Sequence, residues 1–175
     1  MKKYTLLLDD TIEVSGITLH RIKALSSFNG VSVGDLGGYI EKVDNLSQYG
    51  DAWVYGNAWV SGNAKVFGDA SVFGDARVFG DAIVYGDARV YGYAKVFGYA
   101  SVSGDAKVFG DARVSKDPIV LSGLPYQVLF CDMYVTVGYQ QHKPKEWLAF
   151  SEEEIKDMDG EAATEFYPVL CKLIK

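Results

Sequence analysis

One unbroken six-residue repeat, from Gly50 to Ser115, constrains the fold more than any other feature of the sequence. Alanine fills the third position and valine the fifth position of every hexad. The eleven hexads follow one another without insertion: GDAWVY, GNAWVS, GNAKVF, GDASVF, GDARVF, GDAIVY, GDARVY, GYAKVF, GYASVS, GDAKVF and GDARVS. A period of six suits no common α-helical repeat, and a helix would expose half of the valines. The repeat therefore favours short strands joined by tight corners.

The alanine and valine positions lie two residues apart, so both side chains point to the same side of a strand. The residue between them and the residue after the valine point to the other side. A Gly-Asp or Gly-Asn pair turns each corner, because glycine, asparagine and aspartate best tolerate a left-handed backbone. Identical strands with identical corners stack best on copies of themselves. We therefore predict a mainly β fold with the alanines and valines inside a coil.

This V-x-G-[DN]-A-x pattern resembles the hexapeptide repeat of left-handed parallel β-helix proteins. Their triangular coils hold three hexads, or 18 residues, per turn. Residues 34–54, GDLGGYIEKVDNLSQYGDAWV, also resemble a phage and prophage family of hexapeptide-repeat proteins, for which no common activity is established. The resemblance implies a protein of the host cell cytoplasm. Other proteins from such phages act against host defence systems, as anti-CRISPR proteins do.

We predict three segments. Residues 1–45 read as strands that cap the open end of the coil, since repeat stacks expose unpaired edges. The β-helix spans residues 46–115, with Leu46 and Gln48 in the alanine and valine positions of one imperfect hexad. Residues 116–175 read as a small α/β cap with strands and then helices. Ser151 and Glu154 form a capping box, Asp159-Gly160 ends that helix, and a last helix carries one apolar face. That face consists of Phe166, Val169, Leu170, Leu173 and Ile174.

The overall composition points to a protein without a membrane span or a duplex-binding surface. The net charge is −6, and the last segment holds the acidity, with ten acidic against six basic residues. No basic domain stands out as a footprint for double-stranded nucleic acid. Two cysteines, Cys131 and Cys171, are too few for a disulfide framework. A cytoplasmic protein with reduced thiols is the expectation.

The 18-residue period assigns the outward side chains to three faces. One of them, the basic–aromatic face, combines cations with rings and is our candidate binding site. It consists of Trp59, Arg77, Phe79, Lys95, Phe97 and Arg113. Cations among rings suit an acidic protein surface, a nucleotide or a single strand of nucleic acid. Alternatively, the charges serve only to keep a solvated face soluble.

A second face carries an uninterrupted aromatic column and is our candidate oligomer interface. This aromatic face consists of Trp53, Tyr55, Phe73, Tyr91 and Phe109. These outward rings form more apolar surface than a monomer usually leaves exposed to solvent. We predict a dimer or trimer, and the packing of hexapeptide-repeat enzymes into trimers through their prisms implies the same. Alternatively, the rings stack on one another and stabilise the coil alone.

Two corners depart from the repeat, because Tyr93 and Tyr99 replace the usual aspartate or asparagine. Tyrosine is unusual at a left-handed corner. Both tyrosines fall in the same coil, which marks a possible local binding feature.

The enzyme activities known on hexapeptide β-helices do not fit this sequence. Acyltransferases need a general base, usually histidine, and no histidine lies between His20 and His142. Carbonic anhydrases of this fold need three histidine ligands, and the chain has two. Ice-binding coils present regular threonines, which are absent here. His142 with Cys131 and Cys171 has no recognised zinc spacing. We therefore predict no catalytic residue, metal or cofactor.

The sequence thus favours a non-enzymatic binding scaffold with a protein partner, with inhibition of a host defence protein as one possibility. Two alternatives stay open: sequestration of a nucleotide-like anion by basic and aromatic residues, and a degenerate hexapeptide acyltransferase.

Overall fold

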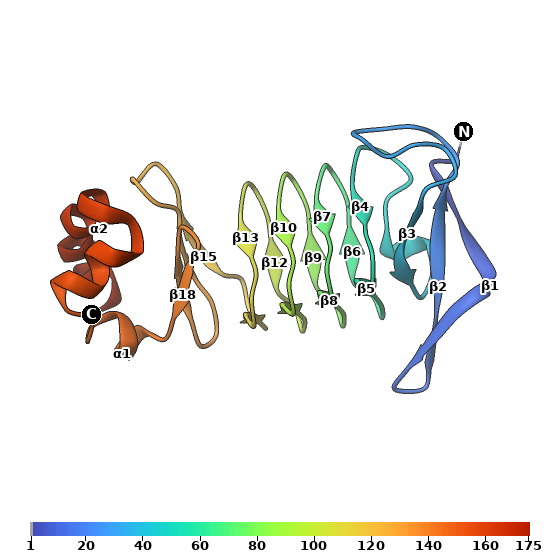
Figure 1. Cartoon of the computed structure of the whole chain (residues 1–175). Coiled ribbons are helices and arrows are strands. Elements are labelled where there is room, and N and C mark those ends of the chain that lie inside the picture. The colour runs from blue at the N-terminus through green and yellow to red at the C-terminus, as the bar shows by residue number, and fades with distance from the viewer. Residues whose placement is uncertain (1) are drawn as a thin grey trace. The chain divides into compact units, whose positions relative to one another are not determined.

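The computed structural model describes residues 2–175 and divides the chain into two compact units, Met1–Pro118 and Ile119–Lys175. The first unit contains a parallel coil of strands (Figure 1). The second contains a small antiparallel sheet and two helices. The predicted mainly β class is confirmed. Neither of the described helices is long and apolar enough to span a membrane.

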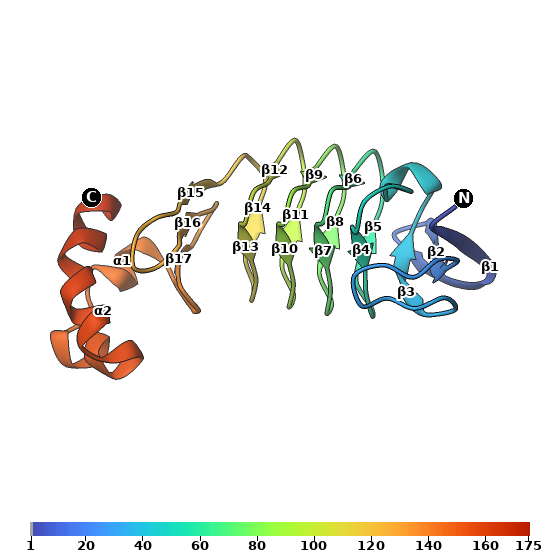
Figure 2. The same cartoon turned by 90° about the horizontal axis from the view of Figure 1, so that it is seen from above.

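Each of the eleven hexads forms one two-residue strand of the coil. The strands are β4 (Trp53–Val54), β5 (Trp59–Val60), β6 (Lys65–Val66), β7 (Ser71–Val72), β8 (Arg77–Val78), β9 (Ile83–Val84), β10 (Arg89–Val90), β11 (Lys95–Val96), β12 (Ser101–Val102), β13 (Lys107–Val108) and β14 (Arg113–Val114). Every third strand pairs in parallel, so the coil has three sides, β4-β7-β10-β13, β5-β8-β11-β14 and β6-β9-β12 (Figure 2). The predicted parallel β-helix with three hexads per coil is confirmed.

The alanines and valines of the repeat fill the inside of the coil. All of them, from Ala52 to Ala112 and from Val54 to Val114, are at most 1% exposed. The backbone N–H groups of each coil donate to carbonyls of the next, as Arg77 N does to Ala94 O at 2.9 Å. The branched valine and the small alanine therefore alternate with outward side chains, as a pleated strand requires.

Three N-terminal strands extend one side of the coil. β1 (Tyr4–Val14) and β2 (Ile17–Ala24) form an antiparallel hairpin, and β2 pairs with β3 (Leu36–Ile40). β3 then pairs in parallel with β5, which makes a seven-stranded sheet in the order β1-β2-β3-β5-β8-β11-β14. The predicted cap is thus a continuation of the sheet that carries the basic–aromatic face.

The first imperfect hexad does not lie where the repeat predicts. The short helix η1 (Val43–Asn45) precedes Leu46, which bridges to Val66 rather than to Ala64. Leu46 is therefore not in the alanine position, and the Gln48 side chain accepts a hydrogen bond from Lys3 N at 2.8 Å. The prediction was wrong by two residues, because the chain takes two extra residues between Leu46 and Trp53, after η1.

The second unit packs two helices on a four-stranded antiparallel sheet. The strands are β15 (Ile119–Leu121), β16 (Val128–Phe130), β17 (Val135–Val137) and β18 (Gln140–His142), and the helices are α1 (Pro144–Trp147) and α2 (Glu152–Ile174). The predicted capping box is present, since Ser151 Oγ accepts from Glu154 N and the Glu154 carboxylate accepts from Ser151 N. α2 bends at Asp159 and Gly160, whose dihedral angles are not helical.

The buried face of the second half of α2 is narrower than the sequence predicts. Phe166 and Leu170 are buried in the core of this unit, together with Trp147 and Ile155. Val169 and Leu173 are 44% and 40% exposed, so their predicted place on the apolar face was wrong.

Candidate functional site

The basic–aromatic face lies on the side of the coil formed by β5, β8, β11 and β14. Trp59, Arg77, Lys95 and Arg113 are partners in register across these four strands. Neighbouring strands of a sheet are about 4.8 Å apart. The structure therefore brings the three predicted cations and the tryptophan into one column.

The rings of this face form a second column beside the cations. Phe79 and Phe97 stack with ring centroids 5.2 Å apart and planes 8° from parallel, and Trp59 lies 5.7 Å from Phe79. The Arg77 guanidinium lies 5.8 Å from the Trp59 ring centre, and that of Arg113 lies 5.2 Å from the Phe97 ring centre. These contacts hold the arginine stems against the rings while both residues stay exposed to solvent.

The positive charge of the column is not balanced by neighbouring acids. Within residues 2–175, none of Arg77, Lys95 and Arg113 forms an ion pair with a carboxylate. Neighbouring strands place the backbone attachment points of these like-charged side chains about 5 Å apart, so their charges repel one another. An anion on this face would relieve that repulsion.

Two further residues continue the column, and the hexad pattern misses both. Tyr39 is the register partner of Trp59, and Arg21 is the partner of Tyr39 with its guanidinium 4.3 Å from the ring centre. Asp10 accepts a hydrogen bond from Arg21 Nε at 2.7 Å, so this fourth cation is neutralised. Tyr39 precedes Trp59 by 20 residues, which no search with an 18-residue period would find.

The two tyrosines at corners bracket β11, and neither has the left-handed φ that the sequence predicted, because Gly92 and Gly98 take it instead. Tyr93 and Tyr99 occupy the corners before and after β11 and are 65% and 84% exposed. The corresponding corners of β8 are Asp75 and Asp81, and each accepts a hydrogen bond from the asparagine one coil earlier. β11 therefore carries Lys95 between two exposed rings, without an acid at either corner.

The aromatic face lies on the side formed by β4, β7, β10 and β13, but one of its predicted members is not on the surface. Trp53 is 1% exposed, because Tyr4 and Phe28 cover it edge-on at ring distances of 6.0 and 5.3 Å. Its prediction as an oligomer contact was wrong. A buried indole under the N-terminal segment cannot reach another subunit.

The other rings of this face form a regular stack. Phe73 and Tyr91 lie 4.8 Å apart and Tyr91 and Phe109 lie 5.2 Å apart, with planes within 15° of parallel. These rings are half-buried, so stacking on one another removes part of their apolar surface from solvent. A shallow hollow remains, lined by Tyr55, Ser71, Phe73 and Arg89, where the short Ser71 side chain follows Trp53 in the column.

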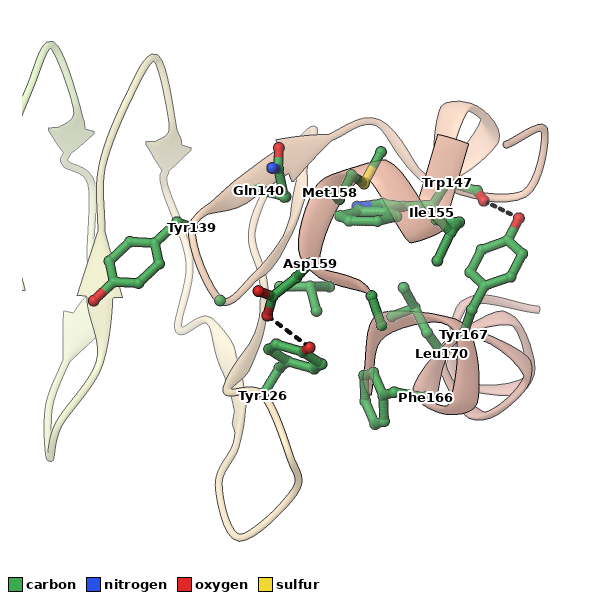
Figure 3. Close-up of a pocket in the computed structure, with 13 residues that line it drawn as sticks. Tyr126, Tyr139, Gln140, Trp147, Ile155, Met158, Asp159, Phe166, Tyr167 and Leu170 are labelled. Atoms are coloured by element: carbon green, nitrogen blue, oxygen red, sulfur yellow. Dashed lines mark hydrogen bonds between the residues drawn. The ribbon is translucent and has the colours of Figure 1, made fainter. Parts of the chain in front are cut away.

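The second unit contains a cavity that the sequence did not predict. It measures about 250 Å³ and lies between the sheet and the bent helix α2 (Figure 3). Its inner wall is formed by buried side chains, namely Val137, Trp147, Ile155, Phe166 and Leu170. Tyr139 and Asp159 lie at its exposed rim. No period in the sequence marks such a cavity, because it forms where a strand, a short helix and both halves of α2 meet.

The histidines and cysteines do not gather into a reactive group. In the described part of the chain, no three histidine, cysteine or acidic side chains lie close enough to hold a metal ion. His142 packs edge-on against Trp147 and Phe150 at ring distances of 5.0 and 4.8 Å. Burial is the main cause that raises the pKa of the Cys131 thiol, which leaves it protonated and unreactive at neutral pH.

Comparison with known proteins does not assign the chain to a family. Neither protein-family models nor curated proteins match this sequence.

Proposed function

We propose that the chain is a non-catalytic binding scaffold whose basic–aromatic face takes an acidic surface of a protein partner. The observation that carries the proposal is the in-register column of Arg77, Lys95 and Arg113, none of which has an acidic partner in the described residues. The parallel sheet holds the Cα atoms of the three residues in register, so an acidic partner orders three side chains but no loop.

The shape of the face supports a macromolecular partner over a small ligand. Small-molecule sites are usually concave and enclose most of the ligand. The basic–aromatic face instead lies on a sheet side whose four strands spread the cations along the coil axis. The exposed rings of Tyr93 and Tyr99 widen it at Lys95. Aromatic residues and arginine are the side chains most enriched at protein interfaces. The host defence protein implied by the family resemblance is one partner of this kind.

Reversing the central charge should weaken binding. Lys95→Glu is expected to weaken the affinity for a fluorescently labelled glutamate-rich peptide by at least about tenfold at low salt, or about 1.4 kcal/mol. Lys65→Glu is the matched control, because Lys65 projects from β6 on a different side of the coil. Fluorescence anisotropy measures both affinities. Equal affinities for the two variants would exclude the basic–aromatic face as the site.

The same measurements separate the alternative functions. Sequestration of a nucleotide-like anion predicts tighter binding of cyclic nucleotides or a thymidine oligonucleotide than of the acidic peptide. A thermal shift with acetyl-coenzyme A would instead support a degenerate acyltransferase and contradict a non-catalytic scaffold.

We also propose that copies of the chain associate through the aromatic face. The hollow around Ser71 leaves space for an apolar side chain from a second copy. Light scattering should give a multiple of 19.2 kDa, and Phe73→Lys should return the mass to that of one chain. Phe67→Lys is the control, since Phe67 also stacks on one ring, Tyr85, but on another side of the coil. A mass near 19.2 kDa for the unmodified chain at every concentration would contradict the association.

A further inference from the structure

The cavity of the second unit has the features of a site for a small ligand. Protein interiors are packed so closely that voids larger than a water molecule are few. This cavity measures about 250 Å³, which exceeds the roughly 150 Å³ that is enough to hold a benzene ring. Nine of its lining residues, Met158 and Ala163 among them, are apolar or aromatic side chains that belong to the unit's core or pack against it.

The cavity is held open by specific contacts. Gly160 has a φ of +66°, which favours glycine, and it lets α2 bend around the space. The Tyr167 hydroxyl lies 2.7 Å from the Trp147 carbonyl oxygen (Figure 3) and 3.0 Å from that of Phe150, and its single proton, donated to either, fixes α1 to the second half of α2. The Trp147 indole donates to Val135 O at 2.7 Å. Collapse of the walls would break these bonds.

One charged group lies at the rim. Of the lining residues, only Asp159 carries a charge, and its Oδ2 accepts a hydrogen bond from the Tyr126 hydroxyl at 2.7 Å. This bond holds the carboxylate beside the cavity, and Oδ1 keeps its capacity to accept a further bond. Residues 119–175 contain nine acidic and five basic residues, so the surroundings repel anions as well.

We propose that this cavity binds a small amphiphilic amine, with its apolar body against Trp147 and Phe166 and its ammonium group on the Asp159 carboxylate. The volume suits one ring with a short chain. The apolar wall has no polar groups that the body would leave without a hydrogen bond. At the rim the Asp159 carboxylate can accept a charge-assisted hydrogen bond from the ammonium group, whose other N–H groups can donate to solvent. Fatty acids and other anionic amphiphiles are disfavoured by the same carboxylate.

Three probes with the same phenylethyl body and a different polar end test the charge preference on the full chain by calorimetry. We expect 2-phenylethylamine to bind at least about tenfold more tightly than 2-phenylethanol, and 3-phenylpropanoate to bind most weakly. Asp159→Asn should abolish the preference for the amine and leave binding of the alcohol unchanged. Asp157→Asn is the matched control, because Asp157 is an exposed carboxylate of α2 that does not line the cavity.

A cavity-filling variant tests the location. Ala163→Phe places a ring in the space and should abolish binding of the amine and the alcohol alike. Circular dichroism establishes whether this variant folds. If Ala163→Phe does not fold, the comparison of Asp159→Asn with Asp157→Asn tests the proposal instead. The proposal is overturned if the unmodified chain binds neither probe, if folded Ala163→Phe binds them as before, or if Asp159→Asn keeps the preference for the amine.

Discussion

Replacing Gly68 with alanine should lower the free energy of unfolding by about 3–4 kcal/mol, although only one methyl group is added. Gly68 turns a corner of the coil with a φ of +72°. An L-residue pays roughly 1–2 kcal/mol in this region of the backbone. A Cβ atom at Gly68 would also lie 2.9 Å from Gly86 N in the next coil. That neighbour is backbone, so it can move only if the coils separate, and overpacking of this kind costs about 1–3 kcal/mol more.

The matched variant Gly56→Ala separates the two effects. Gly56 turns an equivalent corner with a φ of +60°, but the nearest atom to an added Cβ is Gly74 O at 3.8 Å, an ordinary contact. Only the backbone cost of about 1–2 kcal/mol is expected there. Urea denaturation in a Trp147→Phe background measures both, because the remaining tryptophans, Trp53 and Trp59, report on the coil. Equal losses for the two glycines would mean that stacking between corners does not limit the side chain at Gly68.

The interior of the coil could be predicted from sequence because one rule repeats. Alanine and valine at fixed positions define the inside, the corners and the 18-residue register, and each new hexad adds the same information. Asp159-Gly160 was recognisable as a break in the helix for a similar local reason, since Gly160 adopts a left-handed φ. Such features depend on neighbours close in the chain.

The features that sequence missed depend on contacts between distant segments. Tyr39 joins the basic–aromatic column only because two extra residues between Leu46 and Trp53 shift the register, and Arg21 joins it through an antiparallel strand. Trp53 obeys the repeat, yet Tyr4 and Phe28 cover it. The cavity exists because the bend in α2 turns Ile155 and Phe166 toward one space. No local pattern carries that information.

The chemistry at the two edges of the coil follows from the direction of its hydrogen bonds. Each N–H points toward the next coil, so the first coil is left with unpaired carbonyls and the last with unpaired N–H groups. Side-chain donors pair with the carbonyls of the first coil. Asn45 Nδ2 donates to Ala64 O at 2.8 Å, and Lys3 Nζ donates to Ala52 O at 2.8 Å. A side-chain acceptor pairs with an N–H group at the opposite end of the coil, where Asp117 Oδ1 accepts a hydrogen bond from Ser101 N at 2.7 Å.

The Lys3 cap should make the coil more stable at alkaline pH, the reverse of what is expected for a favourable ion pair. Lys3 is 5% exposed and its ammonium also donates to Gly50 O at 3.1 Å. Burial is the largest effect on its pKa and lowers it to about 8, against the smaller opposing influence of Asp51 and Asp69. In the unfolded chain the pKa of lysine returns to its ordinary value of about 10.4.

Between those two values the unfolded state binds more protons than the folded state, so the free energy of unfolding rises with pH. The cost of burying the charge is fully present below about pH 8 and is relieved as the pH approaches 10, a gain of about 2 kcal/mol. Burial raises the pKa of Tyr4, so loss of stability from that group begins only above its ordinary value of about 10. Urea denaturation between pH 7 and pH 10 should show the rise in the unmodified chain. Lys3→Met should lack this rise and lose some stability above about pH 8.5, where the Cys131 thiol, whose pKa burial raises, ionises first in the unfolded chain. An equal rise in both would assign it to another group.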